Sequence, residues 1–398
     1  MPVMAKVALV ACDRYDQEMV DKAVARGLEL LGGPEQFARS EETILLKPNV
    51  LYGDPPEKCT STHPTVLKAV IKAFRPTGAR ITYGDSPGFG PSHAALKGAK
   101  LAEAAEEMGI EEADFRTGRE VPVGGAGIDS ILDSVPIAQG VLDSGGVVSL
   151  PKLKTHGFQK YTGCVKNQYG CVPGLTKAAF HVRFPDANDF AKMLLTVNRI
   201  VNPRLYIMDG IWGMEGNGPR GGTPVNMGLL LFSTDPIALD ATVCRMIHLD
   251  PQNVPTIKFG VIQGDGTDKE EEIELAGEPI EQFKKTDFII DRAPLRPYRD
   301  GGPFRLSANV LVPKPTIDPE KCIRCGVCVQ ACPADPKALS WPEGKPGENP
   351  PVYDYSNCIR CYCCQEMCPE SAVYLRKTII RKLFDALSGG GQKNDRKQ

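Results

Sequence analysis

The chain has 398 residues, of which 42% are hydrophobic and 24% charged, and its formal net charge is −2. This length is enough for one large and one small domain, and the near-neutral charge excludes a general attraction to nucleic acid or to an anionic membrane surface. No nucleic-acid partner is therefore predicted. No apolar run reaches the ~18 residues that a membrane-spanning helix needs, so no membrane span is predicted either.

Residues 1–292 alternate short apolar runs with segments of helical periodicity. One helical face runs from Val20 to Leu31, a second helix is expected after Pro64, and an Ala-rich third over residues 93–108. This alternation predicts an α/β domain with a mainly parallel sheet and helices on both faces. The predicted strands are Lys6–Ala11, Thr43–Leu46, Arg80–Tyr83, Val147–Leu150, Leu205–Met208 and Met227–Phe232.

Polar or glycine-rich segments follow five of these predicted strands. In parallel sheets, ligands bind beyond the carboxyl ends of the strands, so we expect the five segments to gather at one edge and to form a site. They are residues 47–49, 84–90, 151–156, 209–222 and 233–236.

The residue types in and near these segments favour an anionic ligand, because lysine and arginine side chains and the N–H groups of glycine loops bind carboxylate and phosphate. A histidine or lysine there could also donate a proton to a reduced substrate. The alternatives are solvated surface lysines and a structural histidine. The predicted catalytic residues are His156, Lys152 and Lys166, and the predicted substrate-binding residues are Lys47, Asn49, Lys154, Asn167, Glu215 and Arg220.

Three acidic residues have two interpretations. Asp209, Glu215 and Asp235 could bind a divalent cation through oxygen, or they could cap helices and turns. Capping is favoured for Asp235, which precedes a proline and a predicted helix. Cys164 and Cys171 could share a helix face, although free buried cysteines are the commoner explanation.

The periodic pattern ends after residue 292. Residues 293–315 are rich in proline and show no period, which predicts a linker, or a stiff strap that docks the next domain against the first. Residues 377–398 form a basic tail. Its apolar helical stripe is expected to pack on the chain's own surface and consists of Ile379, Ile380, Leu383, Phe384 and Leu387.

Nine of the 14 cysteines lie between Cys322 and Cys368, where two runs follow the pattern C-x2-C-x2-C-x3-C-P. Residues 316–376 resemble bacterial two-cluster ferredoxins, in which the fourth cysteine of each run binds the other cluster. A small ferredoxin-like α+β domain with two 4Fe–4S clusters is therefore predicted. One cluster is assigned to Cys322, Cys325, Cys328 and Cys368, and the other to Cys358, Cys361, Cys364 and Cys332.

Zinc is the alternative metal, but its sites commonly pair C-x2-C groups across longer gaps. Cys363 is surplus to the pattern and is predicted to be a bystander. No P-loop motif G-x-x-x-x-G-K-[ST] is present, and residues 84–90 do not fit the pattern G-x-G-x-x-G. A P-loop ATPase and a nicotinamide-binding Rossmann site are therefore unsupported.

Several runs in the large domain resemble the domain-of-unknown-function family 362, over most of residues 5–290. Members of that family often carry the same C-terminal ferredoxin pair. The resemblance implies the two-domain architecture but no settled substrate or reaction. It rests on residues 47–49, 151–156, 163–167 and 209–219 and on Asp235 with Asp240.

Two functions fit best. The first is a low-potential oxidoreductase that receives electrons from a redox partner such as a ferredoxin and reduces an anionic small molecule. The second is a non-catalytic relay whose large domain docks a partner redox enzyme, and a structural or sensing role for the clusters is a third. The enzyme is favoured because a relay does not need five polar loops. The clustered cysteines and the absence of a signal-peptide pattern predict a cytoplasmic, anaerobic setting.

Overall fold

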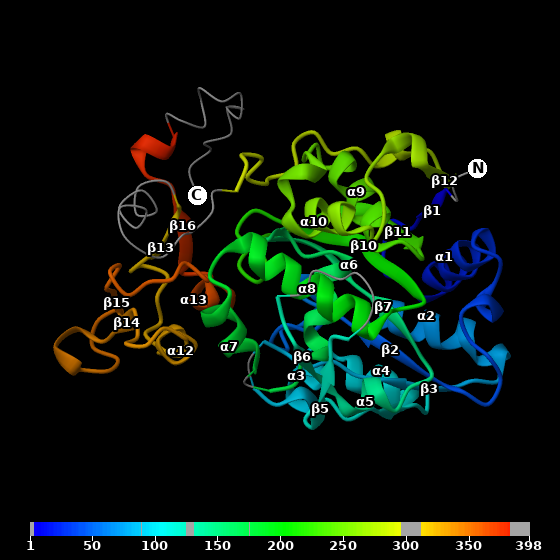
Figure 1. Ribbon diagram of the computed structural model, residues 1–398, viewed down its shortest axis with the longest axis horizontal. Helices are drawn as coiled ribbons and strands as arrows, with labels where there is room; N and C mark the ends of the chain where they lie inside the picture. Colours follow the sequence, from blue (N-terminus) through cyan, green and yellow to red (C-terminus); the bar gives the residue numbers. More distant parts are fainter. Residues whose placement is uncertain (1–3, 89, 125–130, 175, 296–311, 383–398) are drawn as a thin grey trace.

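The computed structural model describes residues 4–88, 90–124, 131–174, 176–295 and 312–382. A ten-stranded sheet with flanking helices forms the larger part of the molecule, and a small module of short strands and helices lies at one end, coloured orange and red in Figure 1. Within the described residues, no helix is both long and apolar enough to cross a membrane.

The large sheet is mainly parallel, with the order β12-β1-β11-β10-β7-β2-β3-β4, and β8 and β9 extend from β10. Along this order only β11 runs antiparallel to its neighbours. All six predicted strands form. The strands are β1 (Ala5–Ala11), β2 (Thr43–Pro48), β3 (Arg80–Tyr83), β4 (Glu111–Glu112), β7 (Gly146–Leu150), β8 (Lys152–His156), β9 (Lys160–Tyr161), β10 (Leu205–Glu215), β11 (Thr223–Ser233) and β12 (Ile273–Gly277), and β5 (Gly118–Pro122) pairs with β6 (Ser134–Ala138) beside the sheet.

Helices cover both faces of the sheet, as predicted. On β1, Val7 and Leu9 enter one apolar core and Ala8 and Val10 enter the other, since successive side chains of a strand point to opposite faces. The first core contains residues of α6 (Cys164–Asn167), α7 (Thr176–Arg183), α8 (Ala187–Val201), α9 (Pro236–Met246) and α10 (Pro255–Gln263). The second contains residues of α1 (Gln17–Leu30), α2 (Pro64–Phe74), α3 (Ser92–Gly98) and α4 (Leu101–Glu107), and α5 (Gln139–Leu142) lies between β6 and β7 in the chain.

The single helix predicted over residues 93–108 is two helices, α3 and α4. Lys100 separates them with a left-handed φ of 56°, which an α-helix cannot contain. Gly98, at the end of α3, packs closely against Gly53. A Cβ added to Gly98 would lie 2.1 Å from the Gly53 carbonyl oxygen. This close approach and the turn that follows it are not visible in the hydrophobic periodicity.

One predicted loop lies at the opposite edge of the sheet. β11 runs antiparallel to β10, and its last residue, Ser233, pairs with Tyr206 near the start of β10. Residues 233–236 therefore lie at the end of the sheet opposite to the other polar loops. Asp235 instead accepts hydrogen bonds from the backbone N–H groups of Ile237 and Ala238 and caps α9. The expected position of this loop was wrong, while the capping interpretation is confirmed.

The C-terminal module contains two small antiparallel sheets and two short helices. β13, before the first cysteine run, pairs with β16, after the second, and β14 pairs with β15 in the insert between the two runs. The elements are β13 (Lys314–Ile317), α12 (Val327–Gln330), β14 (Leu339–Ser340), β15 (Val352–Tyr353), α13 (Cys363–Glu366) and β16 (Val373–Arg376). Most of the predicted strap, and the tail stripe from Leu383 onward, lie outside the described residues.

Candidate functional site

The eight cysteines of the two runs surround two small hollows in the C-terminal module. Each hollow includes one cysteine from the other run, which is the crossed pattern that the spacing predicts. The first hollow is lined by Cys322, Cys325, Cys328 and Cys368, and the second by Cys332, Cys358, Cys361 and Cys364.

The contacts around these sulfurs fit iron–sulfur clusters. The backbone N–H of Ala372 donates to Cys368 Sγ over 3.2 Å, and the Tyr353 hydroxyl donates to Cys364 Sγ over 3.2 Å. Hydrogen bonds to ligand sulfurs tune the reduction potential of such clusters. No three His, Cys, Asp or Glu side chains of the described residues could hold a single metal ion, but each thiolate of a 4Fe–4S cluster binds a different iron.

A cavity of about 610 Å³ lies between the α/β domain and the C-terminal module, and we call it the interdomain cavity. Cys332 lines both this cavity and the second hollow, so the second cysteine set adjoins it. Among the lining residues of the α/β domain are Asn49, Lys154, His156, Thr162, Lys166, Asn167, Lys177 and His181, and among those of the module are Cys332, Cys363, Glu366 and Met367.

Three lysines of the interdomain cavity have no carboxylate partner among the described residues. Lys154 Nζ donates to the Thr60 carbonyl, and Lys177 Nζ donates to Ser86 Oγ and the Val172 carbonyl. Lys166 Nζ lies 5.7 Å from the centroid of the Tyr169 ring. Glu366 also lines the cavity and acts on Lys166, so the three ammonium groups give the lining an excess of positive charge.

Burial acts on the protonation of these lysines. It lowers the pKa of Lys154 to about 7, assisted by the charges of Lys166 and Lys152. It also lowers the pKa of Lys166, and it lowers that of Lys177 to about 8. An anion in the cavity would favour the charged form of each lysine, so the site is suited to a negatively charged ligand.

Lys47 differs from these three because it is already paired. Lys47 Nζ lies 2.7 Å from Asp85 Oδ1 and donates to Asn167 Oδ1, and both charged side chains are buried. Gly170 makes room for this pair, since an added Cβ would lie 1.8 Å from Asp85 Oδ1. Asn49 Nδ2 donates to the same Asn167 oxygen. Lys47 therefore supports the wall of the cavity from behind Asn49 and Asn167.

His156 is buried at the end of β8 and faces the C-terminal module. Its Nδ1 accepts hydrogen bonds from the backbone N–H groups of Phe158 and Gln159, which places the ring proton on Nε2. Nε2 lies 3.1 Å from Glu366 Oε1, although without hydrogen-bond alignment. Burial lowers the pKa of His156 to about 4, so the ring is neutral at physiological pH.

Lys152 belongs to a separate buried network and does not line the interdomain cavity. Lys152 Nζ lies 2.8 Å from Asp209 Oδ2 and 2.7 Å from the Tyr15 hydroxyl, which in turn donates to Asp209 Oδ1. The Tyr15 ring stacks on His63 with the centroids 3.6 Å apart. The side chain predicted as catalytic is thus held in a buried ion pair with Asp209, outside the lining of the interdomain cavity.

Arg220 and Glu215 also lie away from the cavity lining. Arg220 donates to both carboxylate oxygens of Asp54 and, through Nη1, to the Met367 carbonyl over 2.7 Å. Its guanidinium lies 4.0 Å from the centroid of the Tyr52 ring. Glu215 accepts a hydrogen bond from the Ile289 N–H. Arg220 therefore joins the two domains.

Further contacts hold the C-terminal module in place. Gln365 Nε2 donates to the Asn217 and Gly218 carbonyls, and Asn217 Nδ2 donates to the Val373 carbonyl. Tyr362 enters the first core of the α/β domain. The expected fixed docking of the module is therefore present.

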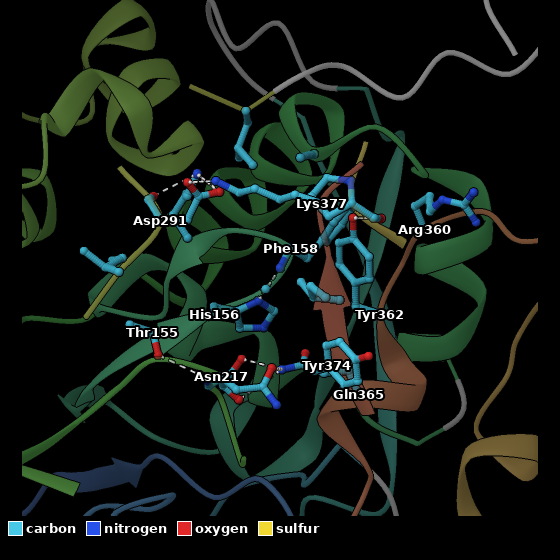
Figure 2. A pocket seen from close by; sticks show the side chains of 18 of the residues that line it. Thr155, His156, Phe158, Asn217, Asp291, Arg360, Tyr362, Gln365, Tyr374 and Lys377 are labelled. Atoms are coloured by element: carbon cyan, nitrogen blue, oxygen red, sulfur yellow. Dashed lines mark hydrogen bonds and ion pairs between the residues drawn. The ribbon is translucent and has the colours of Figure 1, made fainter. Parts of the chain in front are cut away.

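A separate pocket of about 250 Å³ lies on another side of His156, and Figure 2 shows residues that line it. Asp291 there accepts from Lys377 over 2.8 Å and lies 3.1 Å from Lys160 Nζ. These two lysines outweigh the effect of burial and hold the pKa of Asp291 below its usual value. Through Asp291, this pocket links Lys160 of the α/β domain to Lys377, which follows β16 of the C-terminal module.

Sequence patterns found part of the cavity. Asn49, Lys154, His156, Lys166 and Asn167 line it. Other lining residues were missed because they lie in α7 or in the C-terminal module, outside the loops that follow strands. These are Lys177, His181, Cys363 and Glu366.

Comparisons with known proteins agree with this two-part organisation. Residues 44–245 match the family model of a domain of unknown function (DUF362), and residues 314–372 match that of a 4Fe-4S dicluster domain. The apoprotein of lactate racemase from Thermoanaerobacterium thermosaccharolyticum aligns with a TM-score of 0.37 and 13% identity, over 59% of this chain and 55% of that one. This chain therefore spans just over half of that structure.

A curated relative is the "Thylakoid-associated protein sll1697" of Synechocystis sp. (strain ATCC 27184 / PCC 6803 / Kazusa). It is 34% identical over 256 residues, which are 64% of this chain and 78% of the relative. The match covers most of the relative, and the DUF362 model covers half of this chain. Together with the C-terminal match, these findings show that the chain belongs to the DUF362 family and carries a 4Fe–4S ferredoxin-type domain.

Proposed function

We propose that this protein is a low-potential oxidoreductase that transfers electrons to an anionic small molecule in the interdomain cavity. One observation carries the proposal. Cys332, a member of the second cysteine set, and Lys154, Lys166 and Lys177, which lack carboxylate partners among the described residues, line the same cavity. A cavity of about 610 Å³ is also of the size that small ligands occupy.

The 4Fe–4S ferredoxin-type domain implies iron–sulfur electron transfer. When bound, two 4Fe–4S clusters on the predicted cysteine sets would supply single electrons at low potential. Cys325 of the first set is exposed and Cys322 is half-buried, while Cys358, Cys361 and Cys364 of the second are buried. The more exposed first set therefore suits the approach of a redox partner such as a ferredoxin, and the second set, which adjoins the cavity at Cys332, suits delivery into it.

A lysine is the better candidate for the proton donor. His156 carries its proton on Nε2 and has a lowered pKa, so a second proton is not available from it near neutral pH. Burial brings the pKa of Lys154 to about 7, which matches a group that gives up a proton at physiological pH. Lys154 and Lys166 would bind and protonate the ligand, and His156 Nε2–H would orient it.

The non-catalytic relay makes a different prediction, because a relay needs no ligand in the large domain. Mass spectrometry of small molecules released from anaerobically purified protein tests the difference. We expect an anionic compound from the wild-type chain, and a much smaller amount from Lys166→Met, which removes the charge but keeps the apolar stem. Lys22→Met, at an exposed site on α1, is the matched control.

The released compound is then added to chemically reduced protein. Recovery of the visible absorbance of oxidised clusters supports the enzyme, provided that the recovery is slower in Lys166→Met. If wild type and Lys166→Met release the same compounds and reoxidise equally fast, the cavity has no part in the reaction. The relay would then be the better account.

A further inference from the structure

We infer that the ligand of the interdomain cavity is a small dianion whose two charged groups are held apart, one by Lys154 and Lys166 and the other by Lys177. Dicarboxylates and phosphorylated carboxylic acids share this chemistry. The inference rests on the proposed function and narrows its substrate class.

The first anion position lies beside the C-terminal module. Lys154 comes from β8 and Lys166 from α6, and the charge of Lys166 acts on Lys154. Glu366 and Cys363 of α13 act on Lys166. No hydrogen bond from Lys166 is found among the described residues, and its Nζ lies 5.7 Å from the centroid of the Tyr169 ring. An anionic group bound here would therefore lie next to the second cysteine set.

The second anion position lies on the α7 side of the cavity. Lys177 is held by Ser86 Oγ at 2.5 Å and the Val172 carbonyl at 2.7 Å, which leaves one of its three N–H donors for a ligand. Lys177 is thus anchored at Ser86 and Val172, whereas Lys154 is anchored at the Thr60 carbonyl. Two groups of positive charge thus line one cavity.

Buried polar atoms without partners also line this cavity. Within the part of the chain that the structure describes, Thr162 Oγ1 and His181 Nδ1 have no hydrogen-bond partner, and both side chains are at most 6% exposed. A buried polar atom without a partner is destabilising, so a ligand that supplies hydrogen bonds would offset this cost. These atoms suit an uncharged polar part of the ligand.

The charge balance favours two negative charges on the ligand. Asp85 is already paired with Lys47, whereas Glu366 lies beside the neutral His156 and contributes one negative charge to the cavity lining. Three protonated lysines and Glu366 leave a net charge of +2 (3 − 1) in the lining, which one carboxylate does not balance. A monoanion would leave either Lys177 or the Lys154–Lys166 pair without a counter-charge in a buried setting.

Calorimetry with succinate and butyrate tests this inference on the anaerobically purified chain. The two probes have four carbons each and differ in the second carboxylate. We expect succinate to bind at least tenfold more tightly than butyrate. Lys177→Met and Lys166→Met should each reduce succinate affinity at least tenfold and abolish the preference over butyrate, while Lys22→Met should change neither.

Other outcomes separate the inference from the proposed function. If anions bind but only Lys166→Met weakens them, the ligand is a monoanion and the inference is overturned, while the proposed function stands. If neither variant changes binding of either probe, both are overturned. Thermal melting of each variant, and Lys→Arg variants that restore charge, exclude loss of folding as the cause.

Discussion

At the scale of single residues, the buried lysines set the chemistry of the interdomain cavity. A lysine at 1% exposure with only a carbonyl partner, as Lys154 has, is costly to keep charged. Its lowered pKa reflects that cost. An anionic ligand of the kind proposed would return a counter-charge to Lys154 and offset this cost.

Anion affinity should therefore fall as pH rises through about 7, where Lys154 loses its proton. The stability of the ligand-free protein should change in the opposite sense. The unfolded state binds the lysine proton up to its ordinary pKa of 10.5, so stability rises with pH between about 7 and 10.5. Calorimetric titrations with sulfate, whose charge is constant across this range, and urea unfolding measure the two effects.

Lys154→Met should remove the slopes of both pH dependences near pH 7, although Lys177, with a pKa of about 8, continues to titrate in this variant. The other charges that act on Lys154 are Lys166, Lys152, Glu366 and Asp85, and they remain in this variant. If the slopes persist in Lys154→Met, the titrating group is another residue and the assigned role of Lys154 is wrong.

The cysteines make a second prediction at this scale. We expect about eight iron and eight sulfide per chain after anaerobic purification. Cys332→Ser should lose about four iron although it belongs to the first run, because Cys332 lines the hollow of the second set. Cys363→Ser is the matched control and should keep the full iron content, since Cys363 lines neither cysteine hollow.

Iron and zinc analysis by mass spectrometry checks this prediction. A total near four iron in the wild type, zinc in place of iron, or an equal loss in the two variants would overturn the crossed assignment.

At the scale of elements, apolar runs and helical periodicity allowed six strands and the helices α1, α2 and α9 to be predicted. The direction of β11 could not be predicted, since hydrophobic periodicity is the same for parallel and antiparallel strands. The break at Lys100 was missed because Ala-rich segments favour helix on both sides of it. Lys177 was missed for a related reason: it lies inside α7, and its approach to Ser86 depends on packing.

The hairpin of β10 and β11 carries the contacts that dock the C-terminal module. Arg220 in its loop has a buried ion pair with Asp54 and reaches Met367. Arg220→Met should lower stability by about 3 to 5 kcal/mol, because Asp54 would stay buried without a partner. It should also loosen the module, so backbone amides of α13 should exchange hydrogen faster.

Arg199→Met is the matched control for this variant. Arg199 pairs with Asp265, at 16% and 11% side-chain exposure, and this pair lies within the α/β domain. It should lower stability without changing exchange in α13. Faster exchange in α13 in both variants, or in neither, would show that Arg220 has no specific part in docking.

At the scale of the whole molecule, docking converts a ferredoxin-type domain and an α/β domain into one site. The module contributes Cys332, Cys363 and Glu366 to a cavity whose lysines all come from the other domain. Neither half contains the complete arrangement. The cysteine runs alone predicted the electron-transfer part, whereas the cavity follows from packing between residues that are far apart in the chain.

The central claim is that an anion binds in the interdomain cavity close to the second cysteine set. Pulsed electron paramagnetic resonance of the reduced protein with inorganic phosphate tests it most directly, because the phosphorus nucleus reports its distance from a paramagnetic cluster. We predict a phosphorus hyperfine coupling in the wild type and in Lys22→Met that is lost in Lys166→Met. The absence of coupling at saturating phosphate in the wild type, or an equal coupling in Lys166→Met, would contradict the account.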